Sequence, residues 1–314
     1  IATDWEGFRE SLRRTLTDHA GDTEREMDIL REVHHGQVFR LLAQDLAGLQ
    51  TIERLSDHLT ELADTLVQET LPLCWSTIKK RHCETPKFAV IGYGKMGGKE
   101  LGYASDLDMV YLFDDDAMDA EENYTRLDSG LLAVSVDAFR DYQLKNAWVW
   151  EHQALTRARF CAGDPAVGAR FEEIRTEILR QPRVMATLKA EVIAMRQKMA
   201  DAHASHSETE FDLKHDSGGI IDVEFIVQYL ILGHAHAHAS LTGNLGNIAL
   251  LRMAGELGLI DQQQAEAAGN AYREYRRLQH AKRLSAFPKA PIPREEVEKH
   301  IAAVRQLWVA VFGN

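Results

Sequence analysis

The sequence predicts a mainly helical α+β protein with a small mixed sheet between helical segments. Apolar stripes at helical spacing lie near both ends of the chain, whereas short β-like runs are confined to its middle. A length of 314 residues is enough for two or three packed domains. We expect an N-terminal helical segment over residues 1–82, a central α+β domain over 83–222 and a C-terminal helical bundle over 223–314.

The first eighty or so residues are predicted to be helical because apolar residues recur at steps of three and four. One such stripe consists of Trp5, Phe8, Leu12 and Leu16. A second stripe consists of Ile52, Leu55, Leu59, Leu62 and Leu66. Pro86 then ends the helical pattern.

The middle of the chain is predicted to supply the sheet. Runs rich in β-branched and aromatic residues predict strands at Lys87–Ile91, Met109–Phe113 and Leu131–Val134. Ser135 is expected to cap a helix from Val136 to about Leu144. Only part of Ala147–Phe160 is expected in the sheet, and Phe211–Lys214 is predicted to be a further short strand.

The last third of the chain is again predicted to be helical. Val223–Leu232 is apolar on most sides, which indicates a buried helix. Helical spacing continues at Tyr272, Tyr275, Leu278 and Lys282. A terminal amphipathic stripe is formed by Val297, Ile301, Val304, Trp308 and Val311.

Composition excludes several classes of function. A net charge of -12 argues against broad binding to nucleic acid or membranes, although one nucleotide can still bind a small basic site. The apolar run Phe225–Leu232 is too short to span a bilayer. The scattered Cys74, Cys83 and Cys161 give neither a disulfide framework nor a zinc site and fit a reducing cytoplasm. The sequence starts without Met, so we expect a piece of a longer cytoplasmic protein.

The stretch Gly92–Asp108, GYGKMGGKELGYASDLD, follows the first predicted strand and holds five glycines. Its beginning fits G-x-G-x-x-G, and Asp114 lies near the place of the ribose-binding acid of a dinucleotide fold. That fold needs a crossover of about ten or more residues, usually helical, but the next strand begins soon after Asp106. A Walker A loop also fails, because Tyr93 stands where its first glycine belongs and Glu100 follows Gly98-Lys99.

A third interpretation uses the whole stretch. Gly97-Gly98 lets the backbone approach a phosphate closely, because no Cβ intervenes. Asp106 and Asp108 enter the next strand as D-x-D, so their carboxylates share one face about 7 Å apart. Such a pair can hold Mg²⁺ against a triphosphate. Each part alone is common in loops and turns, but their order between two strands favours the core of a nucleotidyltransferase fold.

These residues carry a family resemblance. The segment GYGKMGGKELGYASDLDMVYLFD resembles the catalytic signature of glutamine synthetase adenylyltransferase, the bifunctional adenylyltransferase and adenylyl-removing enzyme of bacteria. The resemblance extends to SGLLAVSVDAFRDYQ, AWVWEHQALTRAR and FDLKHDSGGIIDVEFIVQYL, and so covers most of Lys87–Leu232. The wording G-Y-G-K, K-E-L-G-Y and W-E-H-Q-A-L-T-R-A-R is similar to the C-terminal, adenylylating half of that family.

The resemblance implies transfer of AMP from ATP to a tyrosine hydroxyl of glutamine synthetase, with release of pyrophosphate. It implies that Asp106 and Asp108 hold Mg²⁺ and that Gly97, Gly98 and nearby backbone N–H groups pack on the triphosphate. The attacking oxygen belongs to the partner, so the chain needs no nucleophile of its own, and catalysis would come from positioning and charge neutralisation.

Other side chains have a functional and a structural interpretation. Ser105 either donates its hydroxyl to the nucleotide or caps the turn, which is slightly favoured. Lys99 and Lys95 either neutralise phosphate charge or are solvated. Lys214, sharing a strand face with Asp212, either meets the phosphates or forms a surface ion pair.

Further candidates lie later in the chain. Asp222 and Glu224 either approach the metals or, more simply, cap a helix start. Arg157 and Arg159 are candidates to line the cleft, and Glu151 and His152 either support the site or are structural. His234, His236 and His238 invite a metal interpretation, but on a helix only the outer two share a face, so a native metal is not favoured.

One departure from the family pattern concerns the third acid. The family carries it on a strand in a D-L-R-L-R-P-like segment before S-G-L-L, whereas NYTRLDSGLL here passes directly from an apparent helix into the turn Asp128-Ser129-Gly130. Either the polypeptide truly lacks this segment, or the polypeptide contains it and the sequence omits it. The second alternative is favoured. Asp128 is a poor substitute because it lies in a turn. A true deletion would cripple catalysis.

Two rival functions remain open. The first is deadenylylation of glutamine synthetase by phosphorolysis, which gives ADP where adenylylation gives pyrophosphate. The second is a catalytically silent nucleotide-binding module that docks on glutamine synthetase or a PII-type signalling protein. A PII-type protein is an expected partner in the enzymatic interpretation as well.

Overall fold

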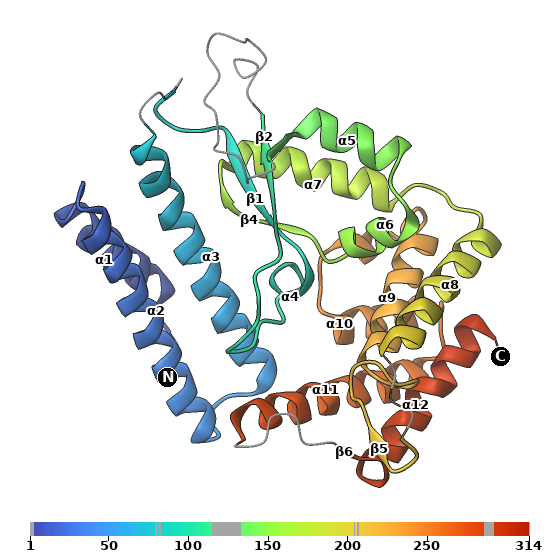
Figure 1. The fold of residues 1–314 in the computed structure, drawn as a ribbon. Helices are drawn as coiled ribbons and strands as arrows, with labels where there is room; N and C mark the ends of the chain where they lie inside the picture. Colours follow the sequence, from blue (N-terminus) through green and yellow to red (C-terminus); the bar gives the residue numbers. More distant parts are fainter. Residues whose placement is uncertain are drawn as a thin grey trace. The chain divides into compact units, whose positions relative to one another are not determined.

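A computed structural model describes residues 3–78, 81, 83–114, 133–203, 205, 207–285 and 292–313 (Figure 1). The chain forms two compact units. Unit 1 comprises Ile1–Tyr142 and Ala158–Ile174, and unit 2 comprises Gln143–Arg157 and Arg175–Asn314. The prediction of a mainly helical α+β protein is confirmed, since 67% of the residues are helical and a small mixed sheet has 4 strands. The three-part division of the chain stays a prediction.

Unit 1 begins with the helices α1 (Trp5–Asp18), α2 (Thr23–Leu46) and α3 (Ile52–Thr77), which confirms the helical pattern predicted for this region. Each begins where a side-chain oxygen accepts a hydrogen bond from a first-turn N–H, and the three capping residues are Asp4, Asp22 and Thr51. The predicted stripe of α1 is buried through Leu12 and Leu16, which pack with Ile29 of α2.

The sheet of unit 1 has the strand order β3-β2-β1-β4. Its strands are β1 (Phe88–Gly92), β2 (Met109–Phe113), β3 (Ala133–Ser135) and β4 (Arg159–Gly163). β1 runs antiparallel to β2 and β4, whereas β2 and β3 are parallel. The first two predicted strands are confirmed almost to the residue. The third is confirmed from Ala133 onward, while Leu131 and Leu132 lie outside the described residues.

Short helices connect these strands. α4 (Gly94–Gly97) follows β1, and α5 (Val136–Lys145) follows β3. The predicted cap is confirmed, because Ser135 Oγ accepts a hydrogen bond from the Ala138 N–H at 3.2 Å. The rings of Phe139 on α5 and Phe171 on α7 (Pro165–Leu179) lie 5.8 Å apart, and the two helices run side by side (Figure 1).

Unit 2 is built around α9 (Ile220–His234), whose side chains are buried on nearly all sides, as predicted for Val223–Leu232. Its other helices are α6 (Val149–Leu155), α8 (Met185–His203), the 3₁₀ turn Ala239–Thr242, α10 (Asn247–Glu256), α11 (Gln262–Leu284) and α12 (Arg294–Phe312). Within the described ranges, no helix is both long and apolar enough to cross a membrane.

One sequence-based expectation in unit 2 is largely wrong. The strand predicted at Phe211–Lys214 is only β5 (Glu210–Phe211), paired with β6 (Ile292–Pro293). The chain then turns, because the Asp212 carboxylate accepts the N–H groups of Lys214 and His215 and so competes with a strand ladder. The histidine run extends past the end of α9, which is His234.

Candidate nucleotide-binding site

The glycine-rich turn (Gly94–Lys99) and the acid pair (Asp106 and Asp108) lie at the same end of the sheet. Because β1 and β2 are antiparallel, Gly92 at the end of β1 pairs with Met109 at the start of β2. The pairing continues one step further, where the Tyr93 N–H donates to the Asp108 carbonyl at 2.8 Å. The turn that follows β1 is therefore placed beside the residues that precede β2.

Gly94 directly abuts the Asp108 carboxylate. A Cβ on Gly94 would lie 2.3 Å from Asp108 Oδ2, closer than side-chain atoms pack, and its φ of +53° is in the left-handed region. Gly92 is similarly confined, since a Cβ there would lie 2.6 Å from Cys161 Sγ. The sequence reasoning emphasised Gly97 and Gly98 and missed Gly94, although its place directly after a strand was the available signal.

Asp106 and Asp108 are both exposed and precede β2 rather than lying within it. Carboxylates exposed to solvent on an extended segment can bind a cation with water and phosphate oxygens completing its shell. Within the described parts of the chain, no group of three or more His, Cys, Asp or Glu side chains is placed to hold a metal ion. The pair offers two hard oxygen donors, which are too few to complete the shell of a divalent cation by themselves.

Gly97 and Gly98 sit at the C-terminal end of α4. Their N–H groups donate within the turn, to the carbonyls of Tyr93 at 2.9 Å and Gly94 at 3.0 Å. Packing of these two N–H groups on a triphosphate, as the family resemblance implies, would compete with those bonds. Gly97 is buried and Gly98 is half-buried, so close approach of a phosphate to this backbone stays a prediction.

Lys99 and Ser105 have distinct local roles. Lys99 is exposed and has a φ of +55°, a region that residues other than glycine rarely occupy. Such backbone strain is concentrated at functional sites. Ser105 Oγ accepts a hydrogen bond from the Gly102 N–H at 2.9 Å, so it caps the turn. The hydroxyl hydrogen of Ser105 is still able to reach a ligand.

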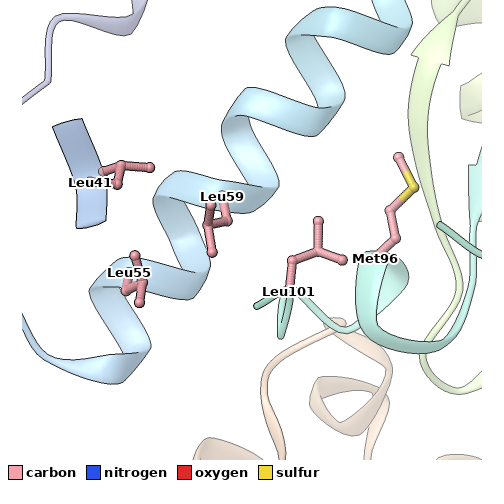
Figure 2. Packing of buried hydrophobic residues seen from close by; sticks show 5 residues of the cluster. All are labelled: Leu41, Leu55, Leu59, Met96 and Leu101. Atoms are coloured by element: carbon pink, nitrogen blue, oxygen red, sulfur yellow. The ribbon is translucent and has the colours of Figure 1, made fainter. Parts of the chain in front are cut away.

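The turn is backed by the N-terminal helices. Met96 and Leu101 belong to one buried cluster with Leu41 of α2 and Leu55 and Leu59 of α3 (Figure 2). Tyr103 also donates its hydroxyl to Asp45 of α2 at 3.2 Å. The predicted helical segment thus supports the candidate site as well as packing within itself.

The two arginines of the TRAR segment have separate partners. Arg157 belongs to unit 2, where its Nη1 lies 2.7 Å from Glu224 Oε1. Arg159 belongs to unit 1 and is buried in an ion pair with Asp64 of α3. Asp64 was missed by sequence reasoning, because it lies 95 residues from Arg159 and no local spacing connects the two.

Lys214, the remaining nucleotide-binding candidate, lies in unit 2 rather than in unit 1 with Gly97, Gly98, Lys99, Ser105, Asp106 and Asp108. It is exposed on the turn that Asp212 stabilises, and its backbone N–H donates to Asp212 Oδ1 at 2.8 Å. The strand face that it was predicted to share with Asp212 does not exist. Binding of phosphate by Lys214 stays a proposal.

The acids at the start of α9 have structural partners. Asp222 Oδ2 accepts the Gly218 N–H at 2.6 Å, which supports the capping interpretation, and its other oxygen pairs with Arg196. Glu224 accepts hydrogen bonds from Arg157 and from the Tyr272 hydroxyl. Both acids therefore contribute to the interior of unit 2.

Glu151 and His152 also have structural contacts. Glu151 Oε2 accepts the Trp148 N–H at 2.8 Å, which caps the start of α6. His152 is buried, with Nε2 2.9 Å from the Gln143 carbonyl and Nδ1 3.0 Å from Arg183 Nη2. Since Arg183 can only donate, Nδ1 accepts and Nε2 carries the hydrogen, which defines a neutral imidazole.

This arrangement predicts a pH dependence of stability. Burial lowers the pKa of His152 below its usual value, and the nearby Arg183 charge acts in the same direction. A histidine whose pKa is lowered on folding stabilises the protein fully above about pH 6.5 and loses that contribution as the pH falls below it. We expect His152→Gln, which keeps a donor and an acceptor, to flatten the decline in the free energy of unfolding between about pH 7 and 5.

Urea unfolding at a series of pH values measures this slope. His236→Gln, which removes an exposed histidine from the same unit, is the matched control. An equal flattening in both variants, or none in His152→Gln, would contradict the prediction.

The histidine run shows no metal-binding geometry among the residues placed. His238 lies beyond the end of α9, and its N–H donates to the His234 carbonyl at 2.9 Å. Burial, followed by the neighbouring histidines, lowers the pKa of His234. These contacts describe a helix C-terminus followed by a turn.

A glycine turn against an acid pair at one end of a small mixed sheet fits the nucleotidyltransferase class. Comparison with known proteins defines the family. Residues 2–128 and 125–174 match the family model of glutamate-ammonia ligase adenylyltransferase. The chain belongs to this family, because its similarity to named members extends over its whole length.

Three relatives have the name bifunctional glutamine synthetase adenylyltransferase/adenylyl-removing enzyme. The Aromatoleum aromaticum protein is 55% identical over 100% of this chain and 36% of its own length. The Chromobacterium violaceum protein is 50% identical over 99% of this chain and 38% of its own length. The Nitrosomonas eutropha protein is 49% identical over 99% of this chain and 38% of its own length. The chain thus spans little more than a third of the length of these relatives.

A second family model, described as GlnD PII-uridylyltransferase, matches residues 186–286. These residues run from α8 to the end of α11 within unit 2. Residues 186–286 are therefore similar to part of another nucleotidyltransferase.

The similarity is interrupted where the sequence predicted a missing strand. The two matched stretches of the adenylyltransferase model meet at Thr125–Asp128. The alignment with the Aromatoleum relative covers 341 positions whereas this chain has 314 residues, which leaves about 27 positions without a counterpart here. The turn at Asp128-Ser129-Gly130 lies outside the described residues. Both findings support an internal segment that relatives have and this sequence lacks.

Proposed function

We propose that this chain transfers AMP from ATP to a tyrosine hydroxyl of glutamine synthetase and releases pyrophosphate. The observation that carries the proposal is the contact between the glycine turn and one acid of the pair, with Gly94 pressed against Asp108. A phosphate on this turn and a cation on these carboxylates would lie next to each other. Family membership supplies the reaction class.

The residues of the site divide the work between them. Asp106 and Asp108 would hold Mg²⁺, which neutralises triphosphate charge when it is bound. Gly97 and Gly98 admit the phosphates close to the backbone, and Lys99 and Lys95 add positive charge beside them. Binding of phosphate by Lys214, which belongs to unit 2, is a separate proposal. Catalysis then consists of placing the α-phosphate for attack by the partner's tyrosine oxygen.

The direction of the reaction is decided by its products. ATP labelled at the α-phosphate, Mg²⁺ and purified glutamine synthetase are incubated with the chain, and Asp106→Asn is run beside it. Label on glutamine synthetase with release of pyrophosphate, both lost in the variant, is the expected result. Release of ADP from adenylylated glutamine synthetase and phosphate would instead establish phosphorolysis.

A silent docking module is the other alternative, and the missing segment favours it. Its signature would be ATP binding that requires Mg²⁺ and gives no labelled product. A PII-type protein is proposed as a regulatory partner, which the match of residues 186–286 to a PII-uridylyltransferase model makes worth testing. Crosslinking a purified PII-type protein to the chain, and asking whether the crosslinked residues lie in unit 2, would test that partner.

A further inference from the structure

A buried guanidinium lies directly behind the glycine turn. Arg159 extends from β4 with its side chain only 10% exposed. Its Nη1 and Nη2 donate to the two oxygens of Asp64 on α3, at 2.7 and 3.0 Å. Nη2 also donates to the Met96 carbonyl of α4 at 3.1 Å. One side chain therefore connects β4, α3 and α4.

The two-pronged contact explains why an arginine occupies this position. A buried charge is tolerated only when it is paired and hydrogen-bonded. A guanidinium binds both oxygens of a carboxylate and still has donors left for a carbonyl, whereas an ammonium is a single point of charge. Asp64 keeps the guanidinium in place, and Nη2 has a further hydrogen for the Met96 carbonyl.

Attachment of α3 to β4 does not depend on Met96. One helical turn after Asp64, Gln68 Oε1 accepts the Gly163 N–H at the other end of β4, at 2.8 Å. The Gln68 contact joins the same helix to the same strand and makes no bond to α4. The third bond of Arg159 is thus specific to the turn.

The Met96 carbonyl has a second donor. The Lys99 N–H approaches it at 3.3 Å, and Lys99 is the residue with the left-handed φ of +55°. The carbonyl that Arg159 orients is therefore the one on which the strained end of the turn closes. Cys161, two residues along β4, lies against Gly92, since a Cβ on Gly92 would be 2.6 Å from its Sγ.

We propose that Arg159, held by Asp64, is a positioning residue that fixes the Gly94–Lys99 turn in the conformation that receives the phosphates of ATP. The inference rests on the proposed function for the identity of the ligand, but not for the fixing of the turn. Without this contact, the Met96 carbonyl loses a charged donor, and the turn is free to shift against Asp108.

The test uses the full 314-residue chain and needs no turnover. Amide hydrogen exchange is measured on peptides covering residues 94–101, together with binding of a non-hydrolysable ATP analogue with Mg²⁺. In Arg159→Lys we expect exchange in this turn to accelerate about tenfold or more and binding to weaken about tenfold, as for loss of a hydrogen bond to a charged group. Asp64→Asn, which keeps Arg159 in place, should change both in the same direction but less.

Two controls separate positioning from general stability. Gln68→Ala removes a second contact of α3 with β4, and Arg13→Lys weakens the pair of Arg13 with Glu69 on α3, whose atoms lie 2.8 Å apart. Neither contact reaches the turn, so exchange over residues 94–101 and nucleotide binding should stay within about twofold of the unchanged chain.

The outcomes are distinguishable. Equal acceleration of hydrogen exchange in the turn in Gln68→Ala and Arg159→Lys would overturn the positioning role, because Arg159 would then act only by attaching α3 to β4. Unchanged exchange in a folded Arg159→Lys or Asp64→Asn would overturn it as well. A turn that loosens as expected in a chain that binds no ATP analogue would instead refute the proposed function and the phosphate assignment, while the fixing of the turn would stand.

Discussion

Replacing Asp222 by asparagine is expected to lower the free energy of unfolding by about 3–5 kcal/mol, the usual cost of removing one partner of a buried ion pair. Asp222 and Arg196 lie inside unit 2 with side chains 5% and 7% exposed. Arg196 also donates to the His215 carbonyl at 2.9 Å, and its Nη1 is buried with no partner among the placed residues. Asparagine would leave this guanidinium without a countercharge.

The position of the Asp222–Arg196 pair means that its loss also affects the loop at the start of α9. The other oxygen of Asp222 accepts the Gly218 N–H at the start of α9, the central helix of unit 2. Gly218 is itself restricted, since its φ is +91° and a Cβ would lie 2.8 Å from Ile301. Tyr275 donates to the Gly218 carbonyl at 2.8 Å. Loss of the carboxylate charge would therefore loosen the loop that α11 and α12 pack against.

Urea unfolding followed by circular dichroism measures the effect. Glu274→Gln breaks an exposed pair with Arg277 on α11 and should cost no more than about 1 kcal/mol. The double variant Arg196→Met with Asp222→Asn removes both charges and keeps an acceptor for the Gly218 N–H, so it should lose less than Asp222→Asn alone. A loss in Asp222→Asn no larger than that in Glu274→Gln would show that the buried pair contributes little.

Local features of this fold could be predicted from sequence, because each depends on neighbouring residues. Periodic apolar residues predicted α1 and α3, and β-branched runs predicted β1 and β2 with nearly the observed bounds. Ser135 was recognised as a helix cap for the same reason. The turn after β1 was found from its glycines, since no other residue permits such close backbone approach.

Features that depend on distant residues could not be predicted. Nothing in the spacing of the chain pairs Asp64 with Arg159, and nothing assigns Arg157 and Arg159, two residues apart, to different units. The strand expected at Phe211–Lys214 failed for another reason. Its alternation was right for a strand, but the Asp212 side chain bonds its own backbone neighbours and turns the chain.

Restoring the segment that relatives carry at Thr125–Asp128 is expected to increase the rate of AMP transfer by about two orders of magnitude or more, if the chain as it stands lacks it. The physical reason is charge. Asp106 and Asp108 are two exposed carboxylates, and the described residues bring no third acid to them. A third carboxylate would complete the oxygen ligands around the cation that the two acids are proposed to hold.

The experiment compares three chains. The first has the present sequence, and the second receives the residues that the Aromatoleum relative carries between the counterparts of Thr125 and Asp128. The third receives the same residues with the aspartate that the family resemblance implies as the third acid changed to asparagine. Transfer of label from α-labelled ATP to glutamine synthetase should increase only in the second chain. Binding of the ATP analogue should change less, because the glycine turn is present in all three.

The control with asparagine decides what the segment does. Equal gains in the second and third chains would assign the benefit to completing the sheet edge beside β3 rather than to a metal ligand. No gain in a folded second chain would count against a catalytic role for this half of the molecule and favour the docking module. The intact mass of the natural polypeptide should be measured together with these rates. If that mass includes the segment, the second chain corresponds to the natural polypeptide and the first is a shortened form of it.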